Sequence, residues 1–292
     1  MPQNPVPSLP PFPAAAFDRL LPWAFEEDEG SGDITSIATI DAMASGQATL
    51  LCKQDGILAG LPLVERVFRH RGFSPQLTAL RREGEALSAG SVIMNLEGPL
   101  RALLVCERIL LNFLQRLSGI ATAAHEYAQA LEGSGTKVLD TRKTLPGYRL
   151  LDKYAVAVGG GSNHRMGLYD MVLVKDNHAE ACGSVRAAVD RIHACYGGKY
   201  PVEAEVRTVA ELETLLDGQV DILLLDNMDD ATLAQAVALA REKAPRIKLE
   251  ASGNMDLARL KGLRGLGLDF VSVGALTHSV KALDISMKIR GS

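Results

Sequence analysis

The second half of the chain alternates short apolar runs with amphipathic stretches, and this alternation constrains the fold more than any other feature. From about residue 123 onward, apolar runs are separated by segments with helical spacing, such as 184–194, 209–216 and 231–243. Strands and helices that alternate at this period predict βα units around a parallel sheet. An open, doubly wound sheet and a closed barrel both fit the pattern.

Each apolar run is expected to be a strand that ends where a polar cluster begins. The expected strands end near Asp140, Val174, Val206, Asp226, Ser252 and Gly274. The carboxyl ends of parallel strands converge at one edge of the sheet, so the polar residues that follow them should face one cavity.

The expected cavity is rich in cations. Its candidates are Arg142, Lys143, Arg165, Lys175 and His164. Several cations in one site repel one another unless an anionic ligand is bound. The planar fork of Arg suits carboxylate or phosphate, whereas Lys acts as a compact charge. The cluster therefore predicts a multiply anionic ligand.

Two acidic residues, Glu205 and Asp226, lie at neighbouring strand ends. Paired carboxylates beside phosphate-binding cations suit Mg²⁺, which binds a few carboxylates together with substrate oxygens and water. At the last two strands, Gly253 and Gly274 allow backbone N–H groups to approach a phosphate closely. The residues therefore predict a phosphate-bearing substrate with a divalent metal.

Simpler interpretations stay open for several of these positions. Asp140 and Asp226 could each cap the helix that follows. Glu203 is expected to be structural or solvent-facing, because it lies deeper in its strand. The three glycines at 159–161 could form a flexible turn, and His178 could be a satisfied histidine next to the site.

The region before residue 123 has a mixed pattern, without the regular alternation seen after it. Residues 48–52 and 91–96 are strand-like, and helices are expected over 61–71 and 99–117. Six of the first thirteen residues are proline, so an extended or disordered tail is expected over residues 1–16.

Composition excludes several classes of protein. A net charge of −4 argues against nucleic acid as the main partner. The sequence contains no apolar run approaching the roughly 20 residues that a membrane helix needs, and no secretory signal. The four cysteines form no CxxC pair, so we expect reduced thiols in a cytoplasmic protein.

Several motifs together resemble the quinolinate phosphoribosyltransferase family, also called nicotinate-nucleotide pyrophosphorylase (carboxylating). They run in one order along almost the whole chain: EDEGSGDITS at 27–36, ER and LN within 107–112, LSGIAT at 117–122, DTRKT at 140–144, GGSNHR at 160–165, VKDNH at 174–178, EAEV at 203–206, LDN at 225–227, SGN at 252–254 and GALTHS at 274–279. Any one motif would be weak, but their order is specific.

The resemblance implies an α/β fold with two domains. An N-terminal α/β sandwich-like domain is expected over residues 17–122, joined by a C-terminal helix at 281–292, and an incomplete α/β (TIM-like) barrel over 123–280. Such barrels usually have seven strands, one more than the six expected above. The resemblance also implies a homodimer, in which the N-terminal domain of one subunit covers the barrel mouth of the other.

The resemblance assigns roles to individual residues. Arg108 would reach the partner's site, and quinolinate would be surrounded by Arg142, His164, Arg165 and Lys175. Lys143 and Thr141 would contact phosphoribosyl pyrophosphate, while Glu205 and Asp226 would hold Mg²⁺ and ribose hydroxyls. The 5′-phosphate would be cradled by Ser252, Gly253, Asn254, Gly274 and Ala275. Catalytic roles would fall to Lys143, Lys175, Glu205 and Asp226, with no general acid assigned between Lys175 and His164.

The implied activity joins quinolinate to phosphoribosyl pyrophosphate, giving nicotinate mononucleotide, CO₂ and pyrophosphate for de novo NAD synthesis. One alternative is a related phosphoribosyltransferase acting on a different ring, such as a protein associated with molybdate transport, which would alter the dicarboxylate pocket. Another is a non-catalytic phosphate-binding barrel, which would need no paired metal carboxylates.

Overall fold

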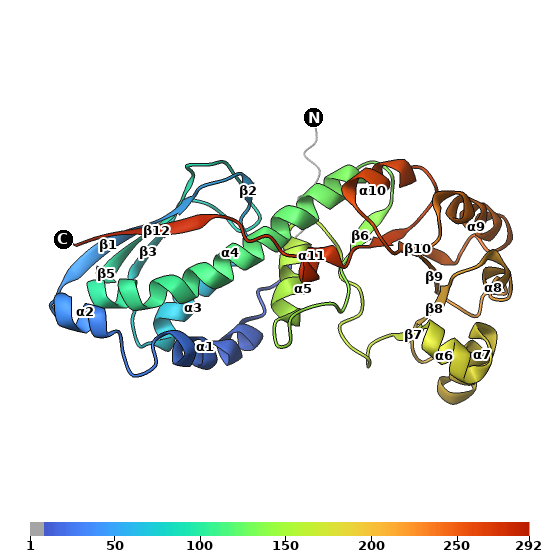
Figure 1. The fold of residues 1–292 in the computed structure, drawn as a ribbon, viewed down its shortest axis with the longest axis horizontal. Helices are drawn as coiled ribbons and strands as arrows, with labels where there is room; N and C mark the ends of the chain where they lie inside the picture. Colours follow the sequence, from blue (N-terminus) through green and yellow to red (C-terminus); the bar gives the residue numbers. More distant parts are fainter. Residues whose placement is uncertain (1–8, 292) are drawn as a thin grey trace. The chain divides into compact units, whose positions relative to one another are not determined.

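The structure, a computed structural model, describes residues 9–291, which form two units (Figure 1). The first unit comprises residues 9–125, 144–160 and 276–291, and the second comprises residues 126–143 and 161–275. The first unit therefore contains both ends of the described chain. No helix among the described residues is both long and apolar enough to cross a membrane.

The second unit is built on a six-stranded parallel sheet whose strands alternate with helices (Figure 1). The strand order is β6-β11-β10-β9-β8-β7. The strands are β6 (Lys137–Leu139), β7 (Val172–Val174), β8 (Val202–Val206), β9 (Ile222–Asp226), β10 (Lys248–Ser252) and β11 (Phe270–Ser272). The helices between them are α6 (Asp176–Cys182), α7 (Val185–Tyr196), α8 (Val209–Glu213), α9 (Asp230–Lys243) and α10 (Leu257–Leu263). This is an incomplete α/β barrel, with strand ends within two residues of those predicted.

A seventh strand is present only as a single bridged residue. Ser162 forms an isolated parallel bridge to Leu139 at the outer edge of β6. The chain leaves this edge after one pair because Asn163 Nδ2 and the backbone N–H of His164 both donate to the Asp140 carboxylate, at 2.7 and 2.8 Å. The described residues therefore give the sheet six full strands, not the seven that the family resemblance implied.

The first unit contains an antiparallel sheet in the order β12-β1-β5-β3 and a separate pair, β2-β4. The strands are β1 (Ser45–Cys52), β2 (Gly56–Ile57), β3 (Gln76–Ala79), β4 (Ala86–Leu87), β5 (Val92–Pro99) and β12 (Ile285–Gly291). The helices are α1 (Ala14–Asp28), α2 (Ile34–Thr39), α3 (Leu63–His70), α4 (Leu100–Ala130, ending beyond the unit), α5 (Arg149–Val158) and α11 (Ala275–His278). Ala48, Leu50 and Cys52 are buried between more exposed neighbours, so β1 buries one face, and Figure 1 shows α3 and α4 on one side of this sheet.

The predicted C-terminal helix at 281–292 is wrong, because the described part of this segment contains strand β12. It pairs with β1 in antiparallel register, with Met287 opposite Leu50. Ile285 and Met287 are buried while Ser286 and Lys288 are more exposed, a period of two that suits a strand. The segment does return to the first unit, as expected for its position, but as an edge strand.

The proline-rich tail predicted over residues 1–16 ends earlier than expected. Residues 1–8 lie outside the described residues. Helix α1 begins at Ala14, and the ring of Phe12 packs edge-on against Phe17 and Tyr154, with centroids 5.7 and 5.3 Å away. The segment just before α1 is therefore packed rather than disordered, because an aromatic residue follows its prolines.

Helix α5 packs within the first unit, although it lies between the expected barrel boundaries of 123 and 280 in the sequence. Arg116 on α4 forms a two-pronged ion pair with the fully buried Asp152, at 3.1 and 2.9 Å. The hydroxyl of Tyr154 donates to Glu83 at 2.7 Å. These polar contacts attach α5 to the first unit.

The glycines at 159–161 are more than a flexible turn. A Cβ atom on Gly159 would lie 2.2 Å from the backbone oxygen of Ala121 on α4. Since real Cβ contacts are not that short, only glycine allows the chain to pass α4 so closely at this point. Gly160 has a positive φ of 93°, which glycine adopts without strain.

Candidate active site

A cavity of about 360 Å³ lies at the carboxyl ends of the parallel strands in the second unit. The predicted residues that line it are Thr141, Arg142, Lys143, His164, Arg165, Lys175, Glu205, Asp226 and Ser252. They lie just after β6 and β7, at the carboxyl ends of β8, β9 and β10 or, for His164 and Arg165, in the loop after the Ser162 bridge. The structure therefore gathers the predicted cations and the predicted acid pair in one cavity.

Other predicted residues do not line this cavity. Gly253, Asn254, Gly274 and Ala275 lie within three residues of the ends of β10 and β11, but are not among its lining residues. A Cβ on Gly253 would lie 2.0 Å from Asn227 Oδ1, so the glycine is required by its neighbouring loop even without a ligand. Arg108 is exposed on α4 in the first unit.

Two arginines of the cavity hold buried N–H groups that have no partner among the described residues. These are Nε of Arg142 and Nε of Arg165. Arg165 is anchored through Nη1, which donates to the backbone oxygen of Met171 at 3.1 Å. Burial lowers the pKa of Arg165, and the nearby charge of Arg142 lowers it further. Two close guanidinium groups with unused donors fit an anionic ligand.

Asp140 orients the loop that carries two of these residues. Its carboxylate is fully buried and accepts from the backbone N–H of His164 and from Asn163. The interpretation of Asp140 as a helix cap is therefore wrong. The same holds for Asp226, because the residue that caps α9 is Asp229, which accepts from Thr232 N at 2.8 Å.

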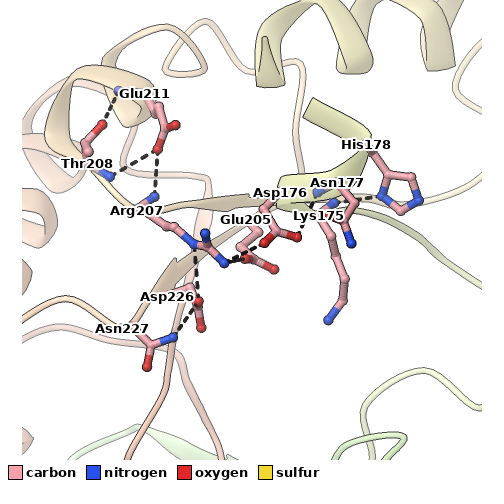
Figure 2. Close-up of polar contacts among 10 residues, drawn as sticks. All are labelled: Lys175, Asp176, Asn177, His178, Glu205, Arg207, Thr208, Glu211, Asp226 and Asn227. Carbon is pink, nitrogen blue, oxygen red and sulfur yellow. Dashed lines mark hydrogen bonds and ion pairs between the residues drawn. The ribbon is translucent and has the colours of Figure 1, made fainter. Parts of the chain in front are cut away.

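The acid pair is accompanied by an arginine that the sequence argument did not single out (Figure 2). Arg207 Nη2 lies 3.3 Å from Glu205 Oε1, and Arg207 Nε lies 3.7 Å from Asp226 Oδ2. Burial raises the pKa of Glu205, and the charge of Asp226 raises it further. The two carboxylates thus repel each other and lie against a cation.

Two buried carboxylates, Glu203 and Glu250, face His164, and both His164 and Glu250 line the cavity. His164 Nε2 lies 3.0 Å from Glu203 Oε2 and 3.7 Å from Glu250 Oε1. The expectation that Glu203 is structural fits this position, whereas exposure to solvent does not, because the residue is fully buried. Burial, followed by the charge of Glu203, raises the pKa of Glu250 to about 8. Glu250 also accepts a hydrogen bond from Ser272 Oγ.

The geometry of this cluster could hold a metal ion, since its ligand atoms lie within 4.8 Å of one another. The imidazole argues against it. His164 Nδ1 accepts from the backbone N–H of Arg165 at 2.7 Å, so the proton of the neutral ring is on Nε2, facing Glu203. Protonation of Glu250 below its raised pKa reduces the negative charge of the cluster, and the buried oxygens of Glu203 have no hydrogen-bond partner among the described residues.

His178 lies outside this cavity. Its Nδ1 accepts from the backbone N–H of Lys175 at 2.9 Å, which closes the first turn of α6 (Figure 2). This agrees with the interpretation of His178 as a satisfied histidine beside the site. Its contact also holds the backbone from which Lys175 reaches the cavity.

Five polar residues that line the cavity were not among the predicted site residues. They are Asp176, Arg207, Asn227, Glu250 and Ser272. Glu250 lies two positions before Ser252 on its strand and Ser272 two before Gly274, and side chains two apart share a face. Asp176 and Arg207 directly follow strands, so the strand-end rule applied more evenly would have included them.

Comparisons with known proteins agree with this geometry. Residues 33–118 match the family model described as quinolinate phosphoribosyl transferase, N-terminal domain, and residues 120–288 match the one for its C-terminal domain. The chain belongs to the quinolinate phosphoribosyl transferase family. Its incomplete barrel and N-terminal sheet are the two domains of this family.

Members of the family are similar over nearly their whole length. The chain is 41% identical to the probable nicotinate-nucleotide pyrophosphorylase [carboxylating] of Bacillus subtilis, covering 93% of this chain and 92% of that protein. It is also 41% identical to the chloroplastic nicotinate-nucleotide pyrophosphorylase [carboxylating] of Arabidopsis thaliana, covering 96% and 84%. The crystal structure of NadC from Streptococcus pyogenes superposes with a TM-score of 0.91 at 41% identity, covering 98% of this chain and all of that one.

Proposed function

We propose that this protein is a quinolinate phosphoribosyltransferase (decarboxylating), converting quinolinate and phosphoribosyl pyrophosphate to nicotinate mononucleotide, CO₂ and pyrophosphate in de novo NAD synthesis. The observation that carries the proposal is the presence, in one cavity, of an acid pair and of two arginines whose buried Nε–H groups have no partner among the described residues. The two arginines can bind a dicarboxylate, and the acid pair can bind a metal-bound phosphoribosyl group. The full-length similarity to pyrophosphorylases supports the same activity.

The cationic side of the cavity would bind quinolinate. Arg142 and Arg165 offer planar donors to its two carboxylates, with Lys175 as an additional charge. His164, held by Asp140 through its backbone and facing Glu203, would contact the ring from a fixed position. Tight binding of the 3-carboxylate would leave the 2-carboxylate free to depart.

The remaining predicted residues would bind phosphoribosyl pyrophosphate. Lys143 and Thr141 follow β6 and line the cavity. In the sheet, β6 lies next to β11 and β11 lies next to β10. The segments after β11 and β10 are the ones proposed to cradle the 5′-phosphate. These segments contain Ser252, Gly253, Asn254, Gly274 and Ala275. Backbone N–H groups beside glycine are suited to a phosphate because no Cβ blocks the approach.

Mg²⁺ is the cofactor that the acid pair fits. The Glu205 and Asp226 side chains are only 7% and 13% exposed, and a guanidinium already lies against both, so their oxygen atoms accommodate a cation. Glu205 and Asp226 would hold the ion and the ribose hydroxyls. When bound, Mg²⁺ would neutralise charge on the departing pyrophosphate.

In the first step, the pyridine nitrogen attacks C1 of the ribose while the bond from C1 to pyrophosphate breaks. Lys143 would stabilise the negative charge on the leaving group, and a preorganised charge is effective in a closed site. The bond to the 2-carboxylate then breaks and CO₂ departs, which leaves the electron pair on C2, where the positive charge of the adjacent pyridinium nitrogen stabilises the carbanion. A proton takes the place of the carboxylate, with Lys175 and His164 as the candidate donors.

We further propose that the protein is a cytoplasmic homodimer in which Arg108 reaches the partner's site. The exposure of Arg108 on α4 is compatible with that role, since a residue that binds in another subunit must be accessible. Free thiols at all four cysteines agree with a reducing compartment.

The activity is tested by incubating the purified protein with phosphoribosyl pyrophosphate, Mg²⁺ and quinolinate labelled in its 2-carboxylate. We expect labelled CO₂ and pyrophosphate in equal amounts. Nicotinate is the control, because it lacks the 2-carboxylate and should be used poorly. Equal use of nicotinate, or pyrophosphate release without CO₂, would contradict the proposal.

A further inference from the structure

The guanidinium of Arg207 lies among acidic side chains that follow three adjacent strands (Figure 2). Its Nη2 is 2.7 Å from Asp176 Oδ2, after β7, and 3.3 Å from Glu205 Oε1, on β8. Its Nε is 3.7 Å from Asp226 Oδ2, at the end of β9. One side chain therefore contacts the acid pair and a third carboxylate together.

The contacts of Arg207 compete with a metal ion. A divalent cation held by Glu205 and Asp226 would bind two carboxylates that each already direct one oxygen, Oε1 and Oδ2, at this guanidinium. The two carboxylates are largely buried, and two such charges side by side are unfavourable without a cation. In the absence of a divalent ion, Arg207 supplies the positive charge.

Arg207 is able to leave the acid pair without disturbing the fold. Its backbone N–H donates to Glu211 Oε2 at 2.8 Å, and Thr208 caps α8, so the main chain is fixed independently of the side chain (Figure 2). The side chain of Arg207 is 51% exposed, and that of Asp176 is 43% exposed. Asp176 lies on the solvent side of the pair and offers the guanidinium a partner after it moves.

We propose that Arg207 is an internal counter-cation that neutralises Glu205 and Asp226 until a divalent cation binds, and then remains paired with Asp176 alone. This inference rests on the proposed function, because it takes Glu205 and Asp226 as the metal ligands. Arg207 is then a positioning residue. It holds the acid pair in place for the metal, and it weakens the affinity for the metal by competing for the same carboxylates.

The test is a Mn²⁺ titration of the substrate-free protein, with free Mn²⁺ followed by electron paramagnetic resonance. Arg207→Gln should lower the Kd for Mn²⁺ by about 2- to 5-fold, the size of effect that partly exposed ion pairs reach. Arg207→Lys should give an intermediate Kd, because Lys cannot contact three carboxylates in a fork. Arg186→Gln is the matched control, since Arg186 pairs with Asp190 and Asp217 on the helical side of the same unit.

A second variant tests the proposed release of Arg207 to Asp176. Asp176→Asn removes the alternative partner, so Mn²⁺ binding should weaken. In the Arg207→Gln protein, Asp176→Asn should raise the Kd for Mn²⁺ by a smaller factor than in the wild type, because there is then no guanidinium to relocate. An equal effect of Asp176→Asn in both backgrounds would contradict the release.

The outcomes separate this inference from the proposed metal site. If Glu205→Gln abolishes Mn²⁺ binding while Arg207→Gln leaves the Kd unchanged or raises it, the inference fails and the metal site stands. If Glu205→Gln leaves Mn²⁺ binding intact, the metal assignment fails and the inference fails with it. Unchanged thermal unfolding of Arg207→Gln would show that the fold is preserved.

Discussion

His164 and Glu203 lie with Nε2 and Oε2 3.0 Å apart, and the carboxylate in this contact is fully buried. A second buried carboxylate, Glu250, lies 3.7 Å from the same nitrogen. One histidine of the candidate active site thus faces two acidic groups. The proton on Glu250 keeps this arrangement from carrying two adjacent negative charges.

The first prediction concerns Glu250→Gln and pH. The folded pKa of Glu250 is raised from 4.5 to about 8, so the wild-type protein loses the stabilisation from this group as the pH rises through that interval. The loss should be roughly 2–5 kcal/mol, and Gln, which does not titrate, should avoid it. The Tm of the variant minus that of the wild type should therefore increase between pH 5 and 9. A constant difference would refute the raised pKa.

A second prediction separates binding from stability at Arg142. Arg142→Ala should lower kcat/KM for quinolinate by the equivalent of about 2–5 kcal/mol, because a carboxylate of the bound substrate would lose its guanidinium partner. The Tm should not fall, since the substitution removes a buried Nε–H that has no partner among the described residues. An unchanged KM and kcat would show that Arg142 does not bind the substrate.

The third prediction tests whether subunits share active sites. Arg108→Ala and Lys143→Ala should each be inactive alone. Mixed dimers should recover activity, because half of the sites in a mixed dimer would combine the intact Arg108 of one chain with the intact Lys143 of the other. Activity is measured after the two variants are unfolded and refolded together. Absence of recovery would argue that Arg108 acts within its own chain or not at all.

The fourth prediction checks the C-terminal strand. Met287 is buried and Lys288 is exposed, as alternation along β12 requires. Met287→Ala should destabilise the protein by about 2–5 kcal/mol, whereas Lys288→Ala should change stability by less than about 0.5 kcal/mol. Thermal unfolding of both variants gives the comparison. Similar losses at the two positions would be inconsistent with a strand that buries one face.

Much of the barrel was predictable because each of its strands is a short apolar run that can be recognised from its own residues. The rule that polar residues follow parallel strands brought Arg142, Lys175, Glu205 and Asp226 into one cavity, as the structure has them. The motifs added the family, which the comparisons confirm. The roles of individual residues in binding stay predictions.

What the sequence did not reveal depends on long-range contacts. The segment at 285–291 alternates apolar and polar residues, yet only its pairing with β1 decides that it is a strand. Helix α5 joins the first unit through Asp152 and Tyr154, whose partners are distant in the sequence. Arg207 directly follows β8 and could have been included among the cavity residues, but its contacts with Asp176 and Asp226 arise only when neighbouring strands come together.

The pairing of β12 with β1 has a consequence for biosynthesis. During translation, β1 emerges from the ribosome long before Ile285–Gly291 is made, so one edge of the first sheet stays open while the whole barrel is synthesised. An open edge is a template for association with other chains. The nascent protein should therefore be most prone to aggregation, and most dependent on chaperones, in the interval before its last strand is released.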